Sequence, residues 1–397
     1  MVALIARKAC TLKAACLPGE DVMKVVVLGN QGRAVLNFWT VLMRHLLEKG
    51  HEVVCAVPAA DEEVLTSLST RCTRLRTYPL SRKGLNPFQD LHTLFALWRL
   101  FREEKPDLLF TSTIKPVIYG CLAARAAKVP HIYATITGLG FTFETDSFVK
   151  RCIHTLSVFL QRMALRSAEG VFFQNPDDVN VFRTNGIVNE QTRVLMARGT
   201  GVDTQHFCEA PFLSPPALGE LTFLLVGRLL EAKGLREYAE AAKKVRSLFP
   251  RARFQLLGAA EEGLGAVPLD EVLSWQKEGL IDYLGETSDV RPYLSACHVL
   301  VLPSWREGTP TSVMEAMSTG RACLVTDVPG CREVVVDGEN GRLVPARDPD
   351  LLAEAMIFFL KNPQAVSAMG AAGRKRCVTL FDADVVASRI LEDMHIV

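Results

Sequence analysis

Apolar runs and amphipathic segments alternate along most of the chain. The run "MKVVVLGNQG" from Met23 ends in glycines, an apolar-periodic segment covers 35–49, and a second β-branched run, "HEVVCAVP", follows. Short apolar runs bounded by turn residues are typical of buried strands, and a 3.6-residue periodicity is typical of a helix. The N-terminal pattern therefore predicts a strand–helix–strand unit of a parallel sheet.

The alternation continues, with strands expected at "DLLFTST", "HIYATIT", "GVFFQN" and "RVLMARG" and helices over 87–104, 116–127 and 147–167. Proline, glycine and serine then accumulate over 199–220, which predicts a linker. A second series has expected strands at "LTFLLVGRL", "ARFQLLGA", "IDYLGE", "HVLVLPS" and "CLVTDV" and expected helices over 234–248, 290–296, 310–319 and 349–361. The chain is thus expected to form two doubly wound, Rossmann-like α/β domains with parallel sheets facing a cleft.

The predicted division places an extension outside the fold at 1–22, a first domain at 23–205 and a second domain at 206–378. The remaining segment, 379–397, is expected to be a C-terminal helix that folds back on the first domain, because no strand follows it. Residues 1–22 carry basic and small residues as a signal peptide does, but Lys13 interrupts their apolar region.

Charge is distributed unevenly although the net charge is only +1. Residues 1–210 hold 25 lysines and arginines against 19 acids, and the remainder holds 20 against 25. A basic half favours an anionic membrane surface or a phosphorylated ligand, and ordinary solvated charge explains it as well. The eleven cysteines form no C-x-x-C motif and no cluster with histidine, which predicts reduced thiols and no zinc site.

Two cations follow the first strand of the second half. The segment "VGRLLEAKG" places Arg228 and Lys233 just after that strand, and Gly227 and Gly234 let a ligand approach the backbone closely. A planar guanidinium and a compact ammonium group at the edge of a parallel sheet suit a diphosphate. A solvated turn is the alternative interpretation.

A predicted helix start in "WREGTPTSVMEAM" lies at the same edge of the sheet. Thr309 is a good N-cap and Pro310 suits the first helical position. The free N–H groups of Gly308, Thr309 and Thr311, together with the positive end of the helix dipole, would form a site for an anion or a hydroxyl group.

Two glutamates, Glu307 and Glu315, flank this helix start with E-x7-E spacing. Glu315 stands among apolar neighbours, where a charge is costly to bury without a partner. Either glutamate could instead be a solvated surface acid. Dinucleotide dehydrogenases are disfavoured because the first strand is followed only by Gly29 and Gly32, without the G-x-G-x-x-G motif.

Together these residues resemble those of the retaining glycosyltransferases of family four, which have the GT-B fold. The matching segments include "GRLLEAKG", "GTGVDTQHF", "IDYLGETSDV" and "LPSWREGTPTSVMEAMSTGRACLVTDVPGCREVVVDGENGRLVP". The resemblance implies a UDP-sugar as donor substrate, no cofactor and no metal ion. It also implies that Arg228 and Lys233 hold the donor diphosphate.

For the other site residues, the resemblance implies that Glu307 contacts hydroxyl groups of the transferred sugar. Glu315 would hydrogen-bond the nucleotide ribose, and the backbone N–H groups from Gly308 to Thr311 would meet the sugar and phosphates. Retention in such enzymes needs no protein base, because the leaving phosphate accepts the proton of the acceptor.

The N-terminal half contains "TSTIKPVIYGCLAARAAKVPHIYATITGLGFTF", which is similar to the branch that builds bacterial surface polysaccharides and glycans on a polyprenyl-diphosphate carrier. The resemblance implies substrate-binding roles for Gly32, Lys115, Gly138 and Gly140. Many members carry a histidine where this chain has Thr137, so no catalytic histidine is predicted.

The implied partners are a polyprenyl-diphosphate-linked acceptor and the inner face of the cytoplasmic membrane, which a cytoplasmic peripheral protein would reach; nucleic acid is not expected. The segments "LHTLFALWRLFREEK" and "FVKRCIHTLSVFLQRMALRSA" have the composition of interfacial helices, although outer-layer helices of a sheet show the same pattern. A UDP-sugar 2-epimerase of similar architecture and a non-catalytic module that binds nucleotide sugars are the alternative functions.

Overall fold

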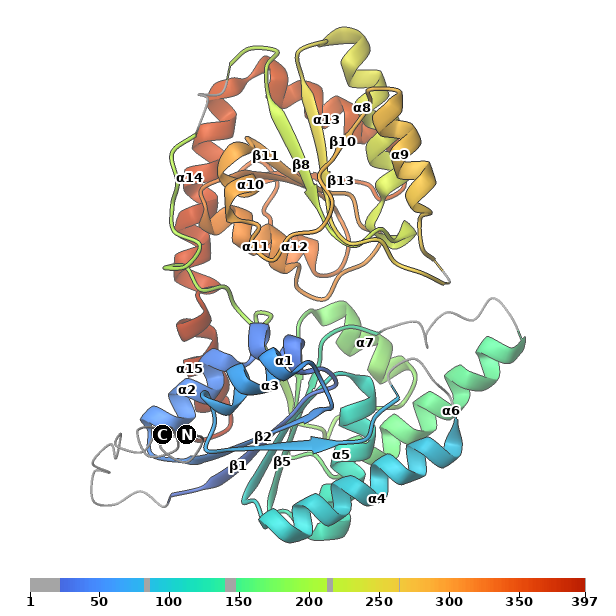
Figure 1. Ribbon diagram of the computed structural model, residues 1–397, viewed down its shortest axis with the longest axis vertical. Coiled ribbons are helices and arrows are strands. Elements are labelled where there is room, and N and C mark those ends of the chain that lie inside the picture. The colour runs from blue at the N-terminus through green and yellow to red at the C-terminus, as the bar shows by residue number, and fades with distance from the viewer. Residues whose placement is uncertain (1–21, 82–85, 140–147, 213–216, 264, 397) are drawn as a thin grey trace, which may run out of the picture. The chain divides into compact units, whose positions relative to one another are not determined.

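The computed structural model describes residues 22–81, 86–139, 148–212, 217–263 and 265–396, and these residues form two compact units (Figure 1). The first unit comprises Met1–Phe173, Asp178–Ala197 and Ala387–Val397, and the second comprises Gln174–Asp177 and Arg198–Val386. Apart from Val22, the extension expected at 1–22 lies outside the described residues.

The first unit is built on a seven-stranded parallel sheet in the order β3-β2-β1-β4-β5-β6-β7. The strands are β1 (Lys24–Leu28), β2 (Glu52–Pro58), β3 (Arg74–Tyr78), β4 (Leu108–Ser112), β5 (His131–Ile136), β6 (Gly170–Phe173) and β7 (Val194–Met196). The four residues of β1 after Lys24 are buried, and β1 pairs with β2 on one side and β4 on the other. Its continuous apolar run is therefore explained by helices covering both faces of the sheet.

Helices connect these strands: α1 (Gly32–Phe38), α2 (Thr40–Glu48), α3 (Glu62–Ser69), α4 (Pro87–Glu104), α5 (Ile114–Ala127), α6 (Phe148–Leu165) and α7 (Pro176–Thr184). The alternation of the sequence does not predict α3. The single helix predicted over 35–49 is wrong, because α1 and α2 meet at Trp39. The indole Nε1 of Trp39 donates to Ser112 Oγ at 3.1 Å, and its ring packs edge-on against Phe110. Trp39 is thus held against β4 at the position where α1 ends and α2 begins.

The second unit is built on a six-stranded parallel sheet in the order β10-β9-β8-β11-β12-β13. The strands are β8 (Thr222–Val226), β9 (Arg253–Leu257), β10 (Asp282–Tyr283), β11 (Val299–Leu302), β12 (Ala322–Thr326) and β13 (Gly341–Val344). The helical elements are η2 (Glu231–Lys233), α8 (Leu235–Leu248), α9 (Leu269–Lys277), α10 (Arg291–Ala296), α11 (Thr311–Ser318), α12 (Cys331–Val334), α13 (Pro349–Lys361) and α14 (Pro363–Leu380).

Side chains of β8 alternate between two apolar cores in the second unit. Phe223 and Leu225 belong to the core that includes α8 and α13, whereas Leu224 belongs to the core that includes α11. This period of two is the expected pattern of a strand that is covered on both faces. The two α/β domains with parallel sheets predicted from the sequence are confirmed.

The last helix, α15 (Ala383–Asp393), joins the two units in sequence. Its residues from Ala387 onward belong to the first unit, where Arg193 donates to the carbonyl of Asp393 at 2.7 Å. Leu391 is 1% exposed and fills part of that unit. The prediction that a C-terminal helix folds back on the first domain is confirmed.

Candidate functional site

The residues singled out in the second half lie at a switch point of the second sheet. From β8 the chain leads to β9 on one side, while β11 lies on the other side of β8. Parallel α/β sheets bind ligands beyond the carboxyl ends of strands at such a point, where the connecting loops diverge. The loop after β8 carries Arg228 and Lys233, and the loop after β11 carries Glu307.

Lys233 and Glu307 form a partly buried ion pair at this point. The ammonium group lies 2.6 Å from Glu307 Oε1, and the two side chains are 23% and 13% exposed. Ser304, which is fully buried, donates its hydroxyl to the same oxygen at 2.6 Å. Within the described part of the chain Oε2 has no recorded hydrogen-bond partner, so this half of the carboxylate can accept from a ligand.

Arg228 occupies a more open position than Lys233. Its guanidinium contacts Glu261 Oε1 at 2.9 Å, and its side chain is 60% exposed. Because an exposed ion pair is weak and easily exchanged, an incoming anion can replace Glu261 as the partner of Arg228. The two predicted cations therefore pair with different carboxylates, Arg228 with Glu261 and Lys233 with Glu307.

The helix start was predicted one residue too early. Helix α11 begins at Thr311, and Pro310 is the N-cap, with a non-helical ψ of 108°. Thr309 was predicted to cap the helix, but its hydroxyl is buried without a hydrogen-bond partner among the described residues. The Thr309 side chain packs on Gly199, where a Cβ atom would come within 2.8 Å of it.

The start of α11 leaves backbone donors available. No acceptor among the described residues is recorded for the N–H groups of Gly308, Thr309, Thr311 and Ser312. Unpaired N–H groups at the positive end of a helix dipole attract anions and polarised oxygen atoms. The site thus combines neutral donors with the lysine and arginine of the neighbouring loop.

Glu315 lies on the one face of α11 that is not fully buried. Thr311, Ser312 and Glu315 are intermediate in exposure, whereas the other residues of the helix are buried. Burial raises the pKa of the Glu315 carboxyl group from 4.5 to about 7. Among the described residues its carboxylate has no recorded partner, so its half-buried charge is uncompensated.

The loop after β12 supports the Glu307 loop, a contact that the sequence analysis missed. Glu307 N donates to Pro329 O at 3.2 Å, and a Cβ atom on Gly330 would lie 2.0 Å from the carbonyl oxygen of Gly308. Glu333 accepts from Gly330 N at 2.6 Å, and burial raises the pKa of Glu333 above its usual range. The G-x-x-E spacing in "PGCREVV" was the available signal for this support.

The candidate residues of the first half belong to the other unit. Gly32 begins α1, and a Cβ atom there would lie 2.9 Å from Val64. Lys115 is the second residue of α5, and its ammonium group donates to Asp90 Oδ1 at 2.9 Å and to the carbonyl of Ser81 at 2.8 Å. Gly138 has a positive φ of 138° with open space around it, and Gly140 lies outside the described residues.

Thr113, also in the first half, has a backbone conformation that the sequence pattern does not indicate. Its φ of 72° is in the left-handed region, which a β-branched residue rarely adopts. The Thr113 hydroxyl is buried without a partner among the described residues. Backbone strain of this kind is common at functional positions, so Thr113, which directly follows β4, is a further candidate residue.

Comparison with known proteins identifies the family. The family described as "Glycosyl transferases group 1" matches residues 220–362, and "Glycosyl transferase 4-like domain" matches residues 36–197. The α-maltose-1-phosphate synthase of Mycolicibacterium smegmatis is 30% identical over 69% of this chain and 74% of its own length. The chain belongs to the glycosyltransferases.

Two other relatives of this glycosyltransferase span most of its length. The N,N'-diacetylbacillosaminyl-diphospho-undecaprenol alpha-1,3-N-acetylgalactosaminyltransferase of Campylobacter jejuni is 25% identical and covers 93% of this chain and 98% of its own length. The UDP-Gal:alpha-D-GlcNAc-diphosphoundecaprenol alpha-1,3-galactosyltransferase of Escherichia coli is 28% identical over 80% and 82% of the two chains.

Solved structures share the fold of this glycosyltransferase. Sucrose-phosphate synthase from Thermosynechococcus elongatus aligns with a TM-score of 0.76 at 17% identity, over 94% of this chain and 98% of its own. Anabaena HepE in complex with UDP-glucose aligns with a TM-score of 0.73 at 18% identity, over 94% and 100%. The predicted GT-B fold is confirmed.

Proposed function

We propose that this glycosyltransferase transfers a hexose or N-acetylhexosamine from a UDP-sugar to a sugar linked to polyprenyl diphosphate, with retention of anomeric configuration and without a metal ion. The observation that carries the donor side is the Lys233–Glu307–Ser304 cluster. It is followed by N–H groups around the start of α11 for which no acceptor is recorded among the described residues. A nucleotide sugar presents the matching chemistry, because it has sugar hydroxyls as donors and a diphosphate as acceptor.

In this proposal the donor spans the switch point of the second sheet. Arg228 and Lys233 hold the diphosphate, and the N–H groups of Gly308, Thr309 and Thr311 add neutral donors. Glu307 reads sugar hydroxyls through the carboxylate oxygen that neither Lys233 nor Ser304 occupies. Glu315 accepts from the ribose hydroxyls.

Charge on the leaving diphosphate is stabilised by protein groups in the proposed mechanism. The bond between the anomeric carbon and the phosphate oxygen breaks while the acceptor oxygen bonds to the same face of that carbon. The acceptor proton passes to the departing phosphate oxygen, so no protein base is needed. Lys233, Arg228 and the start of α11 supply electrostatic stabilisation where the negative charge grows.

The acceptor side of the proposal rests on the relatives. The names of the C. jejuni and E. coli enzymes both specify undecaprenol-linked diphosphate acceptors. We assign Gly32, Lys115, Gly138 and Gly140 of the first half to acceptor binding. Within the described residues no helix is long and apolar enough to cross a bilayer. The proposed location is the inner face of the cytoplasmic membrane, reached as a peripheral protein.

The decisive experiment measures UDP release from a panel of UDP-sugars, with and without an undecaprenyl-diphosphate-linked sugar. The proposal expects a lipid-linked disaccharide with retained configuration, acceptor-dependent UDP release, and full turnover in the presence of EDTA. The Glu307→Gln variant should lose about 100-fold or more in kcat, since it removes a charge placed at the reacting sugar.

Two results would replace the proposal by another function. Epimerised donor formed without UDP release would indicate an epimerase. Tight UDP-sugar binding with no turnover on any lipid-linked acceptor would indicate a binding module.

A further inference from the structure

Helices α4 and α6 of the first unit each expose a row of large apolar side chains. The three on α4 and three on α6 share the spacing i, i+3, i+7, which places each set along one side of its helix. They are Phe88 (82% exposed), Leu91 (63%), Phe95 (59%), Leu156 (59%), Phe159 (53%) and Met163 (40%). We name these six residues the α4/α6 face.

On α6 two polar residues are buried while the apolar row is exposed, although Ala164 and Leu165 of the same helix are buried in the core. Ser157 and Gln161 are buried, at 8% and 0% exposed, and the amide of Gln161 donates to the Ser157 hydroxyl at 2.9 Å. An outer helix of an α/β unit normally buries its apolar side and exposes its polar side. Packing within the unit therefore does not explain why Leu156 and Phe159 point outward.

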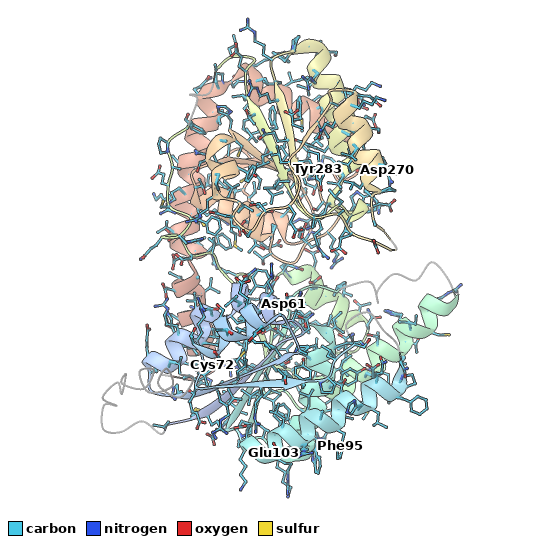
Figure 2. All side chains as sticks on the ribbon, viewed as in Figure 1. Asp61, Cys72, Phe95, Glu103, Asp270 and Tyr283 are labelled. Atoms are coloured by element: carbon cyan, nitrogen blue, oxygen red, sulfur yellow. The ribbon has the colours of Figure 1, made fainter. Side chains whose placement is uncertain are left out.

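The two helices belong to one layer. Both pack against α5, which contacts β4 and β5 of the sheet (Figure 1). Figure 2 labels Phe95 and Glu103 on α4. The α4/α6 face thus consists of two rows on helices that both contact α5. Exposed rows of large apolar side chains mark a surface that meets another apolar phase or partner.

Charges around the α4/α6 face are mainly positive. Arg151 and Arg166 are exposed near the two ends of the α6 row, and the sequence has no acid between Asp146 and Glu169. On α4, the acid nearest to the apolar row is Asp90, which is neutralised by Lys115 at 2.9 Å. Apolar rows with flanking arginines match an anionic lipid surface, in which side chains enter the interface and guanidinium groups meet phosphates.

We propose that the α4/α6 face docks on a bilayer that contains anionic phospholipid. A second copy of the chain is a poorer occupant, because a symmetric contact would bring the α6 arginines of both copies together. The inference rests on the proposed function in one respect, because a lipid-borne acceptor requires the enzyme to work at a membrane. Binding of the protein to vesicles can be measured without donor or acceptor.

The test is co-sedimentation of the full chain with phosphatidylcholine vesicles that contain or lack phosphatidylglycerol. The parent should bind the anionic vesicles, and the double variant Leu156→Ser/Phe159→Ser should bind at least about tenfold more weakly, since two inserted apolar side chains are lost. The matched control is Leu248→Ser on α8, which removes a leucine that is 64% exposed and should leave vesicle binding unchanged. Thermal unfolding of each variant confirms that it is folded.

Failure of the parent to bind anionic vesicles would overturn the inference, as would equal binding by parent and double variant. Concentration-dependent dimerisation of the parent that the double variant lacks would also overturn it, because a second copy would then occupy the face. With acceptor in vesicles the double variant should lose activity, and with detergent-dispersed acceptor it should match the parent. Absence of turnover in both formats would count against the proposed function and leave the vesicle-binding result standing.

Discussion

At the scale of single residues, Glu315 has a carboxyl group that titrates near neutral pH. Its pKa in the folded protein is raised by burial to about 7, above 4.5 in an exposed carboxyl. Because the folded state holds this proton more tightly than the unfolded state, the contribution of Glu315 to stability is most favourable below pH 4.5 and declines as pH rises towards 7. A ribose diol that donates to the ionised carboxylate would supply the missing partner.

We predict that UDP affinity rises between pH 6 and pH 8 by up to about tenfold through Glu315, because its ionised fraction rises from about one tenth to about nine tenths over that range. The Glu315→Gln variant should lack this component, and Glu315→Ala should bind UDP more weakly than the parent. Titration calorimetry of parent and Glu315→Gln checks this, since ionisation of UDP itself affects both equally. Identical pH slopes would remove Glu315 from the ribose site.

Ser304 is expected to position Glu307. Its hydroxyl donates to Glu307 Oε1 at 2.6 Å from a fully buried position, so Ser304→Ala should lower kcat about tenfold by loosening the carboxylate. In the Glu307→Gln background, the same Ser304→Ala substitution should have a smaller effect, because the charge that it orients is gone. Additive losses in this double-mutant cycle would contradict the role. Ser274→Ala, on the exposed side of α9, is the control for a general effect of removing a serine hydroxyl.

At the scale of elements, Gly330 connects the loop after β12 with the loop that carries Glu307. A Cβ atom there would lie 2.0 Å from Gly308 O, in a backbone conformation with φ of 88°. Gly330→Ala should therefore destabilise the second unit by about 2 kcal/mol or more and weaken UDP binding. Gly338→Ala is the matched control, since Gly338 has φ of 77° but no atom within 4 Å of the Cβ position. Urea unfolding of both variants separates backbone strain from the clash, and equal losses would show that the contact with Gly308 is unimportant.

The strands that the sequence predicts most clearly are those whose burial leaves an unbroken apolar run. Strand β1 has four consecutive buried residues, and β11 is buried throughout. Strand β3, "RLRTY", was missed because Arg74 and Arg76 interrupt the run; both pair with Glu104, whose side chain is fully buried. The local sequence pattern cannot indicate a strand such as β3, because its arginines are paired with a glutamate on another element, α4.

Some contacts of the candidate site could also be predicted from the sequence, and others could not. Lys233 and Glu307 could be brought together because the carboxyl ends of parallel strands meet at one edge of a sheet. The contact of Gly330 with Gly308 depends on β11 and β12 being neighbours, which a single sequence does not reveal. Threonine is a preferred N-cap residue, but the Thr309 side chain packs against Gly199, which is distant in the sequence, and does not cap the helix.

At the scale of the whole molecule, the two units have separate cores, and α15 contributes residues to both units. We predict that Leu391→Ala lowers the free energy of unfolding of the first unit by about 2–4 kcal/mol, because Leu391 is 1% exposed and its removal leaves a cavity. Val385→Ala, at a side chain on the same helix that is 45% exposed, should change it by less than about 0.5 kcal/mol.

Differential scanning calorimetry with and without UDP checks this assignment. Under the proposed function, UDP raises the unfolding temperature of the second unit, so the transition that does not respond belongs to the first. Leu391→Ala should shift that unresponsive transition. A shift confined to the UDP-sensitive transition would show that α15 supports the second unit instead.

The place of α15 in the chain also sets the order in which the protein can mature on the ribosome. The seven strands of the first sheet are translated by Met196, but the residues from Ala387 onward that complete the same unit follow only after the second unit. At about 5–20 residues per second this delay lasts roughly 10–40 s, during which the surface destined to meet Ile390 and Leu391 stays uncovered. The unit synthesised first is therefore finished last, and a nascent chain at this stage is a natural client for a chaperone.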